Sequence, residues 1–60
     1  MYQIQFVGEN DFNYGWVIAC DMRQLSNVLT ILKKSNCKRI HIWSMGIEID
    51  QETLQPIASN

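Results

Sequence analysis

The sequence predicts a small α+β domain with the element order ββαββ, in which one helix packs on one face of a four-stranded, mainly antiparallel sheet. Three observations predict it. Apolar and polar residues alternate near the N-terminus, leucines recur at helical spacing in mid-chain, and two short isoleucine-rich segments flank a Met-Gly pair. The 60 residues suffice for one such domain. We expect its core within residues 2–50 and an irregular tail over 51–60, where periodicity is lost and Pro56 interrupts the chain.

The first strand is predicted over residues 2–7. Tyr2, Ile4 and Phe6 alternate there with Gln3 and Gln5, which is typical of a strand with one buried face. Glycine, asparagine and aspartate dominate residues 8–13, so a turn is expected to follow.

The second strand is predicted over residues 14–20, a segment rich in aromatic and β-branched residues. Both of its faces are apolar, so alternation does not show which side meets the helix. We expect the larger side chains, Tyr14, Trp16 and Ile18, to point into the core. Val17 and Ala19 would then lie on the opposite face of the sheet.

The helix is predicted over residues 22–35. Asp21 is a good N-cap, and Gln24 stands three residues later, as in a capping box. Lys33 and Lys34 suit the last turn, and Asn36 suits the left-handed position after it. The apolar stripe that should face the sheet consists of Leu25, Val28, Leu29 and Leu32.

Two further strands are predicted over residues 38–43 and 47–50, joined by a two-residue turn at Met45-Gly46. This turn would pair the two strands in a register that keeps the isoleucines on one face. The expected pairs are Ile42 opposite Ile49, Trp43 opposite Glu48, and His41 opposite Asp50. Two strand orders remain open, 2-1-3-4 and 1-2-3-4. In either order the second face of the sheet has no helix to cover it.

Composition excludes some functions and compartments. The net charge is −1, which gives no long-range attraction to nucleic acid or to an anionic membrane. The first residues lack the basic and apolar regions of a signal peptide, and no apolar run could span a bilayer, so we expect a cytoplasmic protein.

Cys20 and Cys37 flank the predicted helix at about 20 Å, too far for a disulfide, and should stay reduced. Neither a metal nor a cofactor is expected.

A basic cluster suggests nucleic-acid binding as the alternative function. It consists of Lys33, Lys34, Lys38 and Arg39. Four acidic residues are expected near it and would weaken its field, namely Glu9, Asp11, Asp50 and Glu52.

The hypothesis of a catalytic site is not favoured. Cys37, His41 and Asp50 could share the open face, but His41 lies four strand positions after Cys37. That spacing is about 13 Å, which is beyond proton-transfer distance.

The favoured function is a non-enzymatic protein-interaction module of the adaptor or inhibitor type, which self-associates as a dimer through the open sheet face or an edge strand. An exposed tryptophan among small apolar residues is typical of an interface centre. Trp43 is the expected anchor, and the tail, through Leu54 or Ile57, is the alternative cover for it. The expected partner-binding residues are Trp43, His41, Arg39, Val17 and Ala19.

Overall fold

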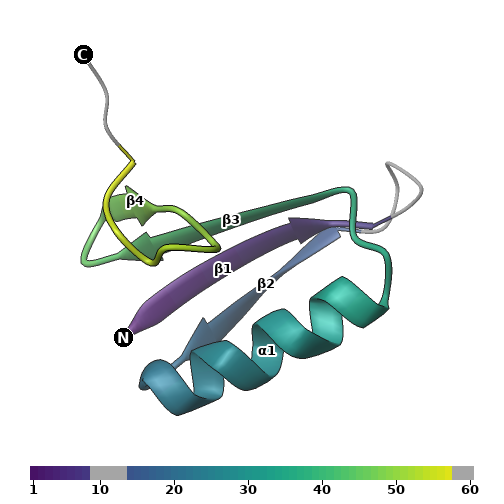
Figure 1. Ribbon diagram of the computed structural model, residues 1–60, viewed down its shortest axis with the longest axis horizontal. Coiled ribbons are helices and arrows are strands. Elements are labelled where there is room, and N and C mark those ends of the chain that lie inside the picture. Colours follow the sequence, from purple (N-terminus) through teal and green to yellow (C-terminus); the bar gives the residue numbers. More distant parts are fainter. Residues whose placement is uncertain (9–13, 58–60) are drawn as a thin grey trace.

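The computed structural model describes residues 1–8 and 14–57, and it confirms the ββαββ order (Figure 1). The predicted turn over 8–13 lies almost wholly outside the described residues. The elements are β1 (Tyr2–Val7), β2 (Tyr14–Ala19), α1 (Met22–Lys34), β3 (Arg39–Ser44) and β4 (Ile47–Ile49).

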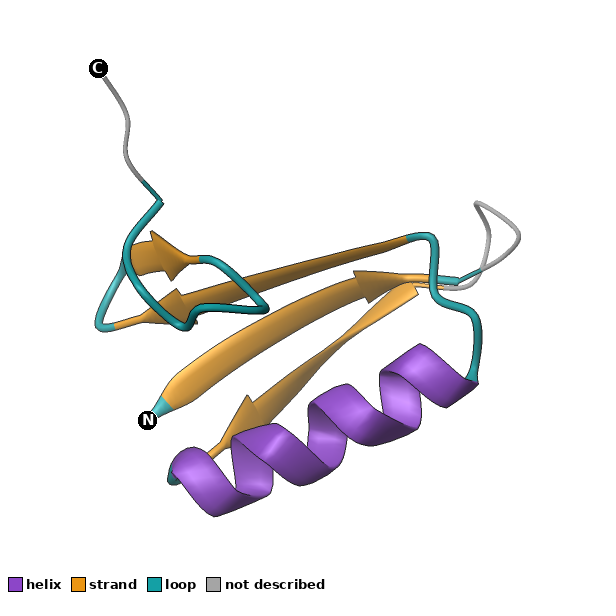
Figure 2. Cartoon of the chain, viewed as in Figure 1, coloured by secondary structure: helices purple, strands orange, loops and turns teal. Residues whose placement is uncertain are grey.

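The strands form one antiparallel sheet in the order β2-β1-β3-β4, the first of the two predicted orders. β1 therefore lies between β2 and β3, as Figure 2 shows. The predicted hairpin register is confirmed, with Ile42 opposite Ile49 and Trp43 opposite Glu48. Both residues of its turn have positive φ, 52° at Met45 and 82° at Gly46, which matches the right-handed twist of the flanking strands.

Local sequence signals set both ends of α1. The Asp21 side chain accepts a hydrogen bond of 2.9 Å from the backbone N–H of Gln24, and the Gln24 side chain accepts one of 2.8 Å from the N–H of Cys20. At the other end Asn36 has φ 56°, as a helix-terminating residue should. Residues adjacent in sequence thus define both ends of α1.

The core lies between α1 and one face of the sheet, and Leu25, Leu29 and Leu32 are its helical part. The sheet contributes fully buried Ile4 and Ile42, each without exposed surface. Among the strands, α1 lies closest to β2, and in Figure 2 the helix runs alongside that strand. On the β3–β4 side of this face, Leu54 of the C-terminal turn packs against the core.

The predicted orientation of β2 is wrong. Ala19 is completely buried and Val17 packs against the core, whereas Tyr14, Trp16 and Ile18 are 59–69% exposed. The physical reason is that this side of β2 faces α1, and the side chains that β2 presents to the core there, Ala19 and Val17, are small. At Gly15 on the same face the neighbour is the ring of Phe6 on β1, because a Cβ there would lie 2.8 Å from Cζ of Phe6.

Residues 51–57 form neither helix nor strand, as expected, but hydrogen bonds hold them against β4. The N–H of Ile57 donates to the carbonyl of Glu48, and Pro56 forms a bridge with Ile49. Leu54 packs against the core, on the helix side of the sheet. It therefore does not cover Trp43, which lies on the other face.

Both cysteines are free, as the helix spacing predicts. Cys20 is exposed, and Cys37 packs partly against the core. Within residues 1–8 and 14–57, no helix is long and apolar enough to cross a membrane.

Candidate functional site

The candidate site is the sheet face opposite α1, which we call the open face. The register and the alternation of each strand place the following side chains on it: Tyr14, Trp16 and Ile18 from β2; Gln3, Gln5 and Val7 from β1; Arg39, His41 and Trp43 from β3; and Glu48 from β4. Three of the predicted site residues, Trp43, His41 and Arg39, are thus brought together. Val17 and Ala19 are not, because they belong to the core.

An aromatic stack occupies the centre of the open face. The rings of Trp16 and Trp43 lie 5.5 Å apart between centroids, with their planes inclined by 27°. His41 stacks on Trp43 in turn, at 5.8 Å and 25°. Because β1 separates β2 from β3, the two indoles meet above the glutamines of β1. The open face is therefore aromatic at its centre.

A hydrogen bond ties this stack to the outer strand. Nδ1 of His41 lies 2.8 Å from Oε2 of Glu48, and both side chains remain partly exposed, at 42% and 38%. The expected pairing of His41 with Asp50 is wrong, since β4 ends at Ile49 and the chain turns there. Asp50 instead accepts hydrogen bonds from the backbone N–H groups of Thr53 and Glu52, which lower the pKa of its carboxyl group.

Charge on the open face is separated along the strands. Arg39 is exposed at the start of β3, and Glu48 lies beside Trp43, four residues further along that strand. At about 3.3 Å per residue, the two charged groups lie roughly 13 Å apart along the strand direction. The face thus has a positive end and a negative end, with the aromatic stack between them.

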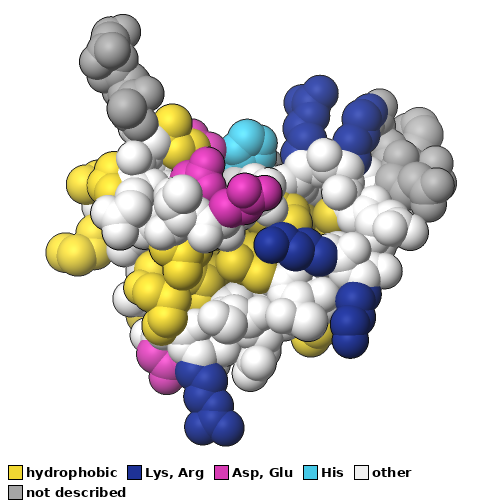
Figure 3. Space-filling model, viewed as in Figure 1, with side chains coloured by type: hydrophobic (Ala, Val, Ile, Leu, Met, Phe, Trp, Pro, Cys, Tyr) yellow, Lys and Arg dark blue, Asp and Glu magenta, His cyan; other side chains and the backbone are white. Residues whose placement is uncertain are grey.

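The basic cluster is divided between two sides of the molecule. Lys33 and Lys34 are exposed in the last turn of α1, whereas Arg39 lies on the open face, and Lys38 immediately precedes it. Most Lys and Arg side chains gather near the end of α1 and the start of β3 (Figure 3). The expected neutralisation by Glu9 and Asp11 falls on residues that the structure does not describe.

Cys37 and His41 do not share the open face, in contrast to the arrangement considered from the sequence. Cys37 packs against the core and His41 lies on the open face, hydrogen-bonded to Glu48. Among the residues that the structure describes, no three His, Cys, Asp or Glu side chains come together as metal ligands would.

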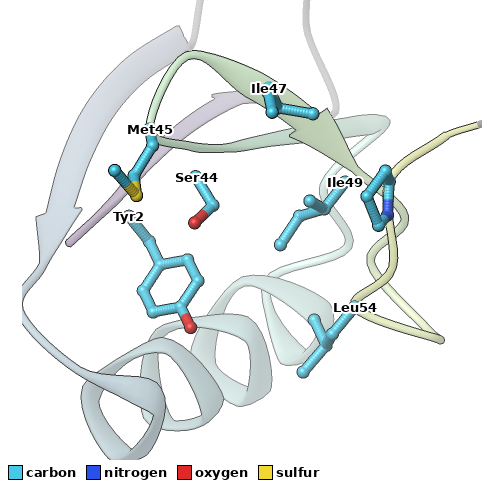
Figure 4. A pocket seen from close by; sticks show the side chains of 7 residues that line it. Tyr2, Ser44, Met45, Ile47, Ile49 and Leu54 are labelled. Carbon is cyan, nitrogen blue, oxygen red and sulfur yellow. The ribbon is translucent and has the colours of Figure 1, made fainter.

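A second surface feature, which the sequence did not reveal, is an apolar hollow of about 260 Å³ on the helix side of the sheet (Figure 4). It opens between the β3–β4 hairpin and the C-terminal turn because α1 lies closest to β2. Its wall is formed by Tyr2, Ser44, Met45, Ile47, Ile49, Leu54 and Pro56. Apolar side chains gather around this region in Figure 3. The side-chain hydroxyls of Tyr2 and Ser44 are the polar side-chain groups of the wall.

Comparison of the chain with protein-family models, curated protein sequences and solved structures gives no significant match.

Proposed function

We propose that this chain is a non-enzymatic protein-binding module and that the open face is its binding surface. The observation that carries the proposal is the stack of Trp16, Trp43 and His41 on a sheet face without a helix. Tryptophan and tyrosine at the centre of a surface, with polar groups around them, are typical of binding hot spots.

The accessible area supports the same role. Tyr14, Trp16 and Ile18 are 69%, 59% and 60% exposed. Together they present on the order of 400 Å² of accessible surface, given the size of aromatic side chains. A standard interface takes about 800 Å² from each partner, so one strand offers about half of it. The other strands can supply the remainder through Val7, Trp43 and the charged rim.

A small module with one dominant surface suits an adaptor or an inhibitor that occludes part of a larger protein. A cytoplasmic location belongs to this proposal, because an exposed thiol such as Cys20 suits a reducing compartment.

The test is quantitative capture from a lysate of the source cell with three immobilised baits: wild type, Trp43→Ala and Asn27→Ala. Asn27 is exposed on α1, away from the open face, and serves as the control. The proposal expects proteins that wild type and Asn27→Ala retain equally and that Trp43→Ala loses. If every captured protein binds all three baits alike, the open face is not the binding surface.

Single-stranded nucleic acid is the second candidate, and one observation favours it. The open face carries two stacked indoles, of which Trp16 is exposed and Trp43 half-buried, together with Arg39, and such groups are the elements of a surface on which bases stack. The net charge of −1 and the position of Lys33 and Lys34 on α1 count against it. Fluorescence anisotropy with a labelled oligonucleotide at low salt decides this: binding that weakens in Trp43→Ala and falls with salt would support it.

A further inference from the structure

We propose that the occupant of the open face is a second copy of this chain, packed face to face about a two-fold axis, with Arg39 of each copy paired to Glu48 of the other. The inference rests on the proposed function, because it uses the same surface. It adds the partner and the register in which the partner binds.

Charge is the first argument. The open face carries Arg39 at one end and Glu48 at the other, roughly 13 Å apart along the strands. The proposed two-fold axis lies between the two sheets and runs across the strands, midway between Arg39 and Glu48. Rotation about this axis places the positive end of one copy over the negative end of the other. Each arginine then meets the glutamate of the other copy, so the face is complementary to itself. A carboxylate has two acceptor oxygens, and Glu48 can therefore hold His41 and an incoming arginine together.

The position of the aromatic residues is the second argument. Trp16 and His41 both lie opposite Gln5 of β1, which is the level midway between Arg39 and Trp43. The proposed axis crosses the sheet at this level, so Trp16 meets Trp16 of the second copy at the centre. The same rotation places Arg39 over Trp43 of the second copy, an arrangement that favours a cation–π contact.

The area and the absence of charge along β2 are the third argument. All six residues of β2, from Tyr14 to Ala19, are uncharged, so no like charges meet where β2 of one copy lies over β2 of the other. The three exposed side chains of β2 supply about half of a standard interface. Two sheets that pack in this way lie about 10 Å apart, a separation that large side chains fill.

The experiment measures the dimer dissociation constant by sedimentation equilibrium up to about 1 mM, a range that covers affinities down to the millimolar level. Wild type, Arg39→Glu, Glu48→Arg and the double variant Arg39→Glu/Glu48→Arg are compared. Each single variant should dimerise at least about tenfold more weakly, because like charges then face each other. The double variant should recover, because it restores both pairs with reversed signs.

The most specific test mixes the two single variants. A mixed dimer of Arg39→Glu with Glu48→Arg has one acidic copy and one basic copy, and both contacts are then between opposite charges. It should form at concentrations where neither variant alone dimerises, and added salt should weaken it. Circular dichroism and thermal melting confirm that each variant is folded.

Two results would overturn the inference. A wild type that stays monomeric up to about 1 mM excludes the second copy as occupant. If the charge variants leave the dimer dissociation constant unchanged, and mixing them gives no stronger association, then the dimer forms through another surface, such as the β2 edge. In either case the proposed function is judged separately, by whether captured partners depend on Trp43.

Discussion

Trp16 and Trp43 stack with their ring centroids 5.5 Å apart, although β1 separates their strands. Neither indole belongs to the core that forms on the other face of the sheet. The first prediction concerns this pair. Close indoles should give an exciton couplet in circular dichroism, and both Trp16→Phe and Trp43→Phe should abolish it. A double-mutant cycle to alanine should give a coupling of about 0.5–1.5 kcal/mol. A couplet that survives either single substitution would mean that the rings are not stacked in solution.

The second prediction concerns the helical stripe. Leu29 is 7% exposed in the centre of the core. Leu29→Ala should lower the free energy of unfolding by about 2–5 kcal/mol, through lost burial and the cavity that remains. In a 60-residue domain this is enough to unfold the protein. Asn27→Ala, on the exposed side of α1, should leave the urea midpoint nearly unchanged. Equal midpoints for the two variants would contradict the assignment of the buried face.

The third prediction concerns Gly15. A Cβ at this position would lie 2.8 Å from Cζ of Phe6, so Gly15→Ala should cost about 1–3 kcal/mol of stability by overpacking. Phe6→Leu removes the ring that causes the clash. The double variant Gly15→Ala/Phe6→Leu should therefore be more stable than the sum of the two single effects. Strict additivity in chemical denaturation would show that the ring does not occupy this space.

The fourth prediction concerns the hairpin turn. Met45 is 92% exposed, so its side chain contributes little packing. Its φ of 52° lies in the left-handed region, which asparagine tolerates better than methionine does. Met45→Asn should raise the free energy of unfolding by roughly 0.5–1 kcal/mol and therefore raise the melting temperature. Met45→Val, which is β-branched at the same φ, should lower it. The opposite order would exclude this turn geometry.

The fifth prediction concerns Asp50. Backbone N–H groups of Thr53 and Glu52 hold the pKa of its carboxyl below the ordinary value of 3.8. The carboxylate therefore stabilises the C-terminal turn above pH 3.8, and this contribution is lost as the pH falls through the lower, folded-state pKa. Hydrogen exchange at the amides of Glu52 and Thr53 should report the loss on acidification. In Asp50→Ala the protection of these amides, taken relative to the intrinsic exchange rate at each pH, should be lost at all pH values. Equal protection in wild type and variant would refute the role of the carboxylate.

Local signals were sufficient for much of the fold. Asp21 and Gln24 place the start of α1, because capping hydrogen bonds join residues three and four apart in sequence. The Met45-Gly46 turn aligns Ile42 with Ile49, because a two-residue turn permits one register. Trp43, His41 and Arg39 were correctly placed on the open face for the same reason, since alternation along β3 follows from that register.

What the sequence by itself determined is therefore the order of the elements, the limits of α1, the β3–β4 register and the face on which Trp43 lies. The tertiary structure alone decided the strand order and which side of β2 is buried. β2 is apolar on both sides, so its own pattern does not distinguish them. The choice is made by packing against α1, because Ala19 and Val17 face the core there and Trp16 faces outward onto Trp43. The central contact of the open face arises from this packing of residues distant in sequence.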